Sequence, residues 1–197
     1  MSSLRATIPG EGEALAEAFS FAARRFAGKE ADFRASAEKA LAEACDRLGV
    51  ELEERREVTL ATGRADAVFN RLIVEWEPPG AMAASKDSHG NRHAVEQVQS
   101  YIDGLAAKER RLVTRLAGVA CDGNYMVFAR YRAGRWWVDD PVPVDAKSAA
   151  LLLDSLLSAQ SGKALIAENL LDDFAGEGAL AYTAVRSLLS QLERERG

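Results

Sequence analysis

Cysteine and histidine are scarce in this chain of 197 residues, which contains two of each. Cys45 and Cys121 lie far apart and neither belongs to a C-x-x-C pair, so we expect neither a disulfide framework nor a structural zinc site. The polar N-terminus does not read as an export signal, which favours a cytoplasmic protein with reduced thiols. No apolar run approaches the roughly 18 residues that span a bilayer, so we expect no membrane partner.

An excess of positive charge is also missing. Twenty-five Lys and Arg residues face 30 Asp and Glu residues, giving a net charge of -5. This net charge excludes non-specific DNA binding through overall positive charge, but it does not exclude a local basic patch. The hydrophobic fraction of 48% and charged fraction of 28% exclude disorder as the main state. The length suits one domain, or one domain with a helical appendage.

Hydrophobic periodicity predicts helices and strands in a mixed order. Helices are expected at 13–26, 32–48, 92–108, 146–159 and within 163–196, and strands at 50–60, 64–69, 72–77, 112–121, 125–131 and 135–138. The central order is therefore α-β-β-β-α-β. A hairpin-rich sheet with helices before and after it predicts an α/β or mixed fold.

Acidic residues interrupt the apolar hairpin formed by the strands at 64–69 and 72–77. Strand alternation places Ile73, Glu75 and Glu77 on one face. Two neighbouring buried carboxylates are costly, and a divalent cation bound by both removes that cost, which favours Mg²⁺ or Mn²⁺. If the two strands are antiparallel neighbours, Asp66 lies beside Glu75 and completes a three-carboxylate cluster. The alternative for each acid alone is a solvent-facing side chain, as at Glu77 before Pro78.

The hairpin residues Gly63–Phe69 and Leu72–Glu77 resemble the PD-(D/E)XK nuclease superfamily, in which an Asp precedes an apolar strand that ends in Glu-x-Lys. Gln97 and Tyr101 are similar to the Gln-x-x-x-Tyr motif of RecB-like nucleases and restriction-enzyme motor subunits. The resemblance implies a restriction-endonuclease-like αβββαβ core over 32–160, a helical lead at 1–31 and a helical extension or linker at 161–197.

The resemblance also implies a metal site. Asp66 and Glu75 would bind Mg²⁺ (or Mn²⁺), and a glutamate of the first core helix would complete the site, with Glu38 as first choice and Glu43 as second. Glu77 would hold or deprotonate the attacking water or bind a second metal ion. The alternative interpretation is that Glu38 and Glu43 are simply surface residues.

Four further residues are expected to face DNA. The resemblance implies that Gln97 orients the phosphate or a metal-bound water, and that Tyr101 contacts the DNA backbone. Arg64, beside Asp66, and Lys86, in the following loop, are candidate DNA-binding cations. For Gln97 and Tyr101 the alternative is two polar residues one helical turn apart.

One residue departs from the family pattern, because Glu77 stands where the family has Lys. That Lys stabilises the attacking water or the charge that develops on phosphorus. Some active members of the superfamily carry Glu-x-Glu, and Lys86 is a candidate for a migrated cation, with a mobile loop lysine as its alternative.

The resemblance, closest to the N-terminal nuclease domain of bacterial restriction-modification enzymes, thus implies a Mg²⁺-dependent DNA endonuclease domain of a restriction-modification or related phage-defence system. Its expected partners are DNA, methyltransferase or helicase domains of a larger polypeptide, and a second copy in a homodimer. The alternative is a catalytically inactive nuclease-like domain that binds nucleic acid or a protein. A third reading is an oligomerisation module formed by the helices after Ala159.

Overall fold

The computed structural model describes residues 2–50, 54–60, 63–69, 71–110 and 112–158, without the side chains of 2–7, 54–60, 63–66 and 158. The chain divides into a unit that ends at Ala159 and a C-terminal unit that begins at Gln160. The predicted extension over 161–197, with its helix, lies outside the described residues. In the described part, no helix is both long enough and apolar enough to cross a membrane.

Helices and strands alternate in the order that the sequence predicts. The helices are α1 (Ser2–Arg25), α2 (Glu30–Arg47), α3 (His89–Glu109) and α4 (Ala146–Ser158), with a short 3-10 helix η1 (Val113–Arg115). The strands are β1 (Glu54–Leu60), β2 (Gly63–Phe69), β3 (Leu72–Trp76), β4 (Ala117–Cys121), β5 (Tyr125–Arg132), β6 (Arg135–Val138) and β7 (Val142–Pro143). The predicted α/β class is confirmed, and the order α-β-β-β-α-β runs from α2 to β4.

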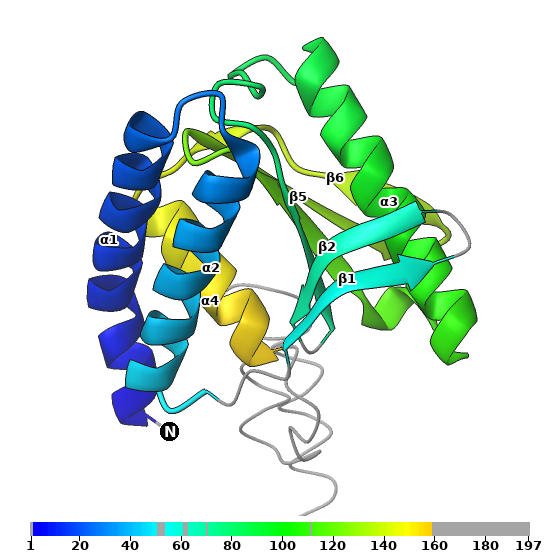
Figure 1. Cartoon of the computed structure of the whole chain (residues 1–197). Coiled ribbons are helices and arrows are strands. Elements are labelled where there is room, and N and C mark those ends of the chain that lie inside the picture. The colour runs from blue at the N-terminus through cyan, green and yellow to red at the C-terminus, as the bar shows by residue number, and fades with distance from the viewer. Residues whose placement is uncertain (1, 51–53, 61–62, 70, 111, 159–197) are drawn as a thin grey trace, which may run out of the picture. The chain divides into compact units, whose positions relative to one another are not determined.

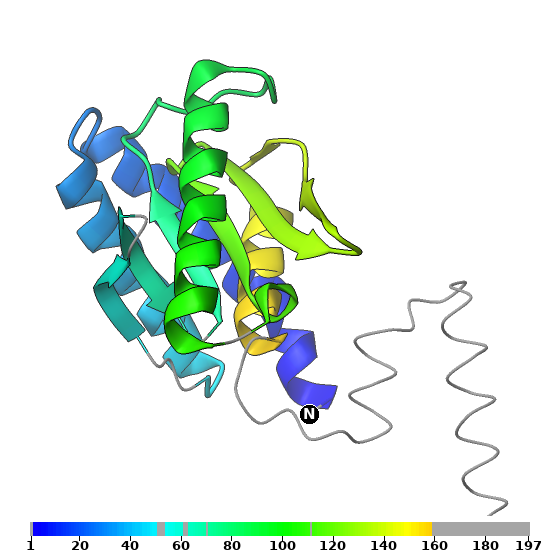
Figure 2. The ribbon, with the colours of Figure 1, turned by 90° about the vertical axis from the view of Figure 1, so that its right-hand side faces the viewer.

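One mixed sheet forms the centre of this unit. Its strands lie in the order β1-β2-β3-β4-β5-β6, and β7 pairs with β5. All pairs are antiparallel except β3 with β4, which are parallel and joined by α3. A parallel connection needs a crossover element, and α3 supplies it. Helices α1, α2 and α4 lie on one side of the sheet and α3 lies on the other (Figures 1 and 2).

The central strand β3 is buried on both faces, and its residues divide between two apolar layers. Leu72, Val74 and Trp76 belong to the layer under α1, α2 and α4, whereas Ile73 belongs to the layer under α3. The Trp76 ring meets Phe19 of α1 and Phe33 of α2 edge-on, with ring centroids 5.5 and 5.9 Å apart. Strand alternation therefore aims position 75 at α3.

Close packing of α3 depends on a glycine. At Gly118 of β4 a Cβ atom would collide with the side chains of Val98 and Ile102, both on α3. The absence of a side chain lets the helix rest directly on the strand beside β3. This contact fixes the distance from α3 to the face that carries Glu75.

Several predicted boundaries are wrong. The strand expected at 112–121 begins only at Ala117, because Arg115 N donates to Leu112 O (2.9 Å) and Leu116 N to Val113 O (3.0 Å), forming η1. Helix α3 begins three residues earlier than expected because Ser88 Oγ caps it by accepting from Asn91 N (3.2 Å). Helix α1 already begins at Ser2 instead of residue 13, and the short β7 was not expected.

Both cysteines lie in the core as free thiols, Cys45 on α2 and Cys121 at the end of β4. Burial raises the pKa of each thiol to about 12. A thiol with such a pKa carries almost no thiolate near neutral pH. Neither cysteine is therefore a candidate nucleophile in the folded chain.

Candidate active site

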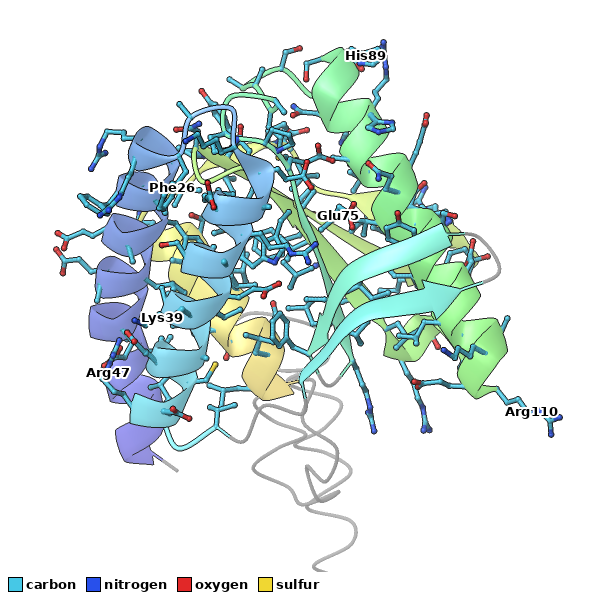
Figure 3. All side chains as sticks on the ribbon, viewed as in Figure 1. Phe26, Lys39, Arg47, Glu75, His89 and Arg110 are labelled. Atoms are coloured by element: carbon cyan, nitrogen blue, oxygen red, sulfur yellow. The ribbon has the colours of Figure 1, made fainter. Side chains whose placement is uncertain are left out.

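Glu75 is the carboxylate at the centre of the candidate site. It lies on β3, paired with Ala120 of β4, and its side chain is 5% exposed. Gln97 of α3 donates a hydrogen bond from Nε2 to Glu75 Oε1 over 3.1 Å. Glu75 thus lies between the sheet and α3, about midway between His89 and Arg110 at the two ends of the helix (Figure 3). A carboxylate buried in this way needs hydrogen-bond partners inside the protein, and Gln97 is one of them.

The sheet-facing stripe of α3 places Gln97 over Glu75. Ala94, Val98 and Ile102 are buried against the sheet, and their spacing of four residues defines the packed stripe. Gln97 precedes Val98 on the flank of this stripe, half-buried. Tyr101 lies one turn further along and is 8% exposed within the same apolar layer. The Gln-x-x-x-Tyr spacing therefore puts both residues on the side of α3 that meets the sheet.

The backbone of β2 brings Asp66 next to Glu75 in register. Ala67 pairs with Val74 and Val68 with Ile73 in the antiparallel β2–β3 ladder. One further step in that register sets position 66 opposite position 75. The side chains of Asp66 and Arg64 lie outside the described residues, so their predicted roles stay predictions.

Glu77 follows β3 directly and extends its alignment with β4. Its N–H donates to Cys121 O over 2.9 Å, and its side chain is 9% exposed. The alternative of a solvent-facing side chain at Glu77 is therefore wrong, because this side chain is buried. Glu75 and Glu77 are therefore two nearly buried acids at the C-terminal end of one strand.

Asp122, which directly follows β4, holds the loop that follows Glu77. It is fully buried at the end of β4. Its Oδ2 accepts from the N–H groups of Gly80 (3.1 Å) and Met82 (3.0 Å). Its Oδ1 accepts from those of Asn124 and Tyr125, both at 2.8 Å. The signal in the sequence that could have identified Asp122 is its position directly after the apolar segment Val119–Cys121.

A buried amide fixes the remainder of the same loop. Asn91, at the start of α3, accepts from Ala83 N (3.1 Å) through Oδ1. Its Nδ2 donates to the carbonyl oxygens of Ala83 (2.6 Å) and Ser85 (2.8 Å). Asp122 and Asn91 together tie the loop between β3 and α3 to the elements that carry Glu75 and Gln97.

The two candidate glutamates of α2 differ in burial. Glu38 is 4% exposed, and its Oε1 lies 3.7 Å from Arg34 Nε. Glu43 has a side chain that is 55% exposed and lies 3.9 Å from Lys39 Nζ. Helix α2 packs on the sheet face of Trp76, opposite the face that α3 covers. Helix α2, which carries both glutamates, therefore lies on the other side of the sheet from the Glu75 side chain, and the ligand role of Glu38 stays a prediction.

Lys86 is bound away from the carboxylates of β3. Its Nζ donates to Val138 O over 2.8 Å and contacts Asp140 Oδ1 at 3.3 Å. These contacts tie the loop after β3 to the end of β6. A role for Lys86 as the migrated cation would require this ammonium to leave both partners.

The donor set around β3 suits a hard divalent cation, because Asp66, Glu75 and Glu77 offer only carboxylate oxygens. Among the side chains that the structure describes, no three His, Cys, Asp or Glu residues gather closely enough to hold a metal ion. The Asp66 side chain lies outside the described residues. Of the residues predicted for this site around β3, the structure therefore describes the side chains of Glu75, its partner Gln97, and Glu77, two residues after Glu75.

Comparison of the chain with protein-family models, with curated proteins and with solved structures finds no match. The site must consequently be interpreted from its own chemistry and from the resemblance of its motifs.

Proposed function

We propose that this chain carries a Mg²⁺-dependent DNA endonuclease domain of a restriction-modification or related phage-defence system. The observation that supports the proposal most is the hydrogen bond from Gln97 Nε2 to the buried Glu75 Oε1. A glutamine on the helix after the acidic hairpin, in contact with the strand carboxylate, is the arrangement that the resemblance to PD-(D/E)XK nucleases implies. DNA is the proposed partner, together with methyltransferase or helicase parts and a second copy of the chain.

Asp66 and Glu75 are the residues that would hold Mg²⁺, with Glu77 as the candidate for a second ion. When bound, the ion lowers the pKa of a coordinated water and neutralises charge on the scissile phosphate. Gln97 fixes the orientation of the Glu75 carboxylate through its Nε2–H group. If Glu77 does not bind a second ion, it would hold or deprotonate the attacking water, and Tyr101 would contact the DNA backbone.

The test is cleavage of supercoiled plasmid by the purified chain in Mg²⁺ or Mn²⁺, with a chelator in the control. The expected result is conversion to nicked or linear DNA in the presence of metal only. Absence of cleavage in both metals, combined with absence of metal binding by calorimetry, would contradict the proposal.

The second candidate is a nuclease-like domain that binds nucleic acid or a protein without cleaving it. Two observations favour it: Glu77 replaces the family Lys, and the Lys86 ammonium is held by Val138 O and Asp140. This candidate predicts little metal-dependent stabilisation, whereas a metal-binding nuclease is stabilised according to the free ion concentration. Thermal unfolding with and without Mg²⁺ separates the two.

Gln97→Leu is expected to reduce the Mg²⁺-dependent cleavage rate by roughly 10- to 100-fold, because a hydrogen bond to a charged group contributes about 1.5–3 kcal/mol. Gln99→Leu is the matched control, since Gln99 is the same residue type on the same helix, also half-buried, and points about 200° away. Initial cleavage rates at saturating Mg²⁺ measure the difference. Equal losses in the two variants would show that the Gln97–Glu75 contact does not support the reaction.

A further inference from the structure

The β5–β6 hairpin presents a row of arginines on one face. In its ladder Arg130 pairs with Trp137 and Arg132 pairs with Arg135, so all four residues lie on the same face. We call these four residues the basic face. All four are exposed, and Trp137, at 41%, is among the most exposed large apolar side chains of the described residues.

The opposite face of the same hairpin fastens it to the fold. Trp136 and Val138 pack against the apolar layer under α3. The Tyr131 and Trp136 rings meet edge-on with centroids 5.4 Å apart. The basic face is therefore displayed by a packed hairpin, which fixes the spacing of its guanidinium groups.

The charges of the basic face are poorly neutralised within the described residues. Arg132 and Arg135 lie directly opposite each other, a placement of like charges that destabilises an antiparallel pair. Neither forms an ion pair with a carboxylate in the described part of the chain. The Arg135 guanidinium lies 4.2 Å from the centre of the Trp137 ring, and Trp137 Nε1 donates to Arg132 O over 3.1 Å. Arg130 alone has an acidic neighbour, Asp139, at 3.6 Å.

Further cations lie at the end of the sheet where β4 begins. Ala117, the first residue of β4, pairs with Arg130, and η1 immediately before it contacts β5. Arg115 of η1 and Arg110, which closes α3, are further exposed cations in this part of the chain. The acidic net charge does not exclude a local basic patch, and the pairing of β5 with β6 forms one from two neighbouring strands.

We propose that the basic face binds the sugar–phosphate backbone of a nucleic acid, at a position separate from Glu75. Arg130 and Arg132 continue the alternation of Met126 and Phe128, which pack in the layer under α1, α2 and α4, so the basic face and the Glu75 side chain lie on opposite faces of the sheet. The pairings of Glu75 with Ala120 and of Arg130 with Ala117 add an offset of about 10 Å along β4. Guanidinium groups bind phosphate oxygens in pairs of parallel hydrogen bonds, and an indole adds stacking area for a base. A polyanion also relieves the repulsion between Arg132 and Arg135.

The proposal rests on the proposed function in taking DNA as the partner, so its test excludes cleavage. Binding of a labelled duplex of about 20 base pairs is measured by fluorescence anisotropy in a chelator, over a range of salt concentrations. The test variant is Arg132→Glu/Arg135→Glu. The matched control, Arg24→Glu/Lys29→Glu, changes the net charge equally at exposed positions outside the hairpin, in the last turn of α1 and directly before α2. Arg132→Lys/Arg135→Lys keeps the charge.

We expect the double glutamate variant to bind about tenfold or more weakly, and its logarithmic salt slope to fall by about two, because each phosphate contact contributes about 0.9. The control and the lysine variant should retain most of the affinity. Equal binding by wild type and the glutamate variant would overturn the inference and indicate that the arginines only protect the β6 edge from pairing. An equal loss of DNA affinity in the Arg24→Glu/Lys29→Glu control would also overturn the inference. A parallel measurement uses phosphatidylglycerol vesicles in place of DNA, and a loss of vesicle binding with unchanged DNA binding in the double glutamate variant would overturn it too.

The two proposals fail separately in this design. If wild type does not cleave DNA in Mg²⁺ but binds it in chelator, and the double glutamate variant binds more weakly, the nuclease proposal is contradicted and the proposal for the basic face is supported. If wild type cleaves DNA and the double glutamate variant binds as tightly as wild type, the nuclease proposal is supported and the proposal for the basic face is contradicted.

Discussion

Glu75→Gln should lose at least about a thousandfold in the rate of Mg²⁺-dependent DNA cleavage, more than the 10- to 100-fold typical of partners that only orient metal ligands. Glutamine keeps the shape of the side chain and removes the negative charge. Glu75 is nearly buried on β3 beside Gln97, so few solvent molecules can replace that charge. Initial rates of plasmid nicking measure the loss, and Glu96→Gln, on the exposed side of α3, is the matched control.

The same variant should be at least as stable as wild type when no metal is present. Burial of an amide costs less than burial of a carboxylate, so thermal unfolding in chelator should show an unchanged or higher Tm. Loss of activity with retained stability assigns Glu75 to the reaction. Full cleavage by Glu75→Gln would remove the carboxylate from the mechanism.

Asp122→Ala should lower the free energy of unfolding by about 3–5 kcal/mol, because four backbone N–H groups lose their acceptor and each buried one costs about 1–3 kcal/mol. Water can reach part of this set, since Gly80 and Asn124 are exposed, whereas the Met82 N–H is buried. Urea unfolding of the purified variant measures the change.

Two variants sharpen the Asp122 test. Asp122→Asn keeps one carbonyl oxygen but sets an amide donor against the other pair of N–H groups, so an intermediate loss is expected. Asp140→Ala, which removes a carboxylate with an 85% exposed side chain, should change stability by less than about 0.5 kcal/mol. If Asp122→Ala unfolds at the same urea concentration as wild type, the four hydrogen bonds do not hold the loop after Glu77.

The central hairpin and the crossover helix were predictable because their residues carry strong local patterns. Leu72–Trp76 is an unbroken apolar strand apart from one acid, and Pro78 with Pro79 forces its end. Position 75 follows from strand alternation, and the approach of Gln97 follows from the helical stripe. These are short-range regularities that need no knowledge of the partner surface.

The elements that the sequence misplaced depend on contacts between distant segments. Asp122 resembles an ordinary turn acid until the loop carrying Gly80 and Met82 is folded against it. Leu112–Leu116 is apolar enough for a strand, but the chain must turn after α3 and forms η1 instead. The basic face needed the β5–β6 register, which sets Arg132 opposite Arg135.

The two buried thiols allow local opening of the folded chain to be measured by chemical labelling. A thiol-specific reagent reacts with Cys45 or Cys121 only when the surrounding packing opens, because both are inaccessible and have a pKa of about 12. Under native conditions the labelling rate of each therefore gives the free energy of the opening that exposes it. Cys45 samples release of α2, and Cys121 samples separation of the strand beside β3. Their comparison tells whether the helical layer detaches before the sheet that carries Glu75.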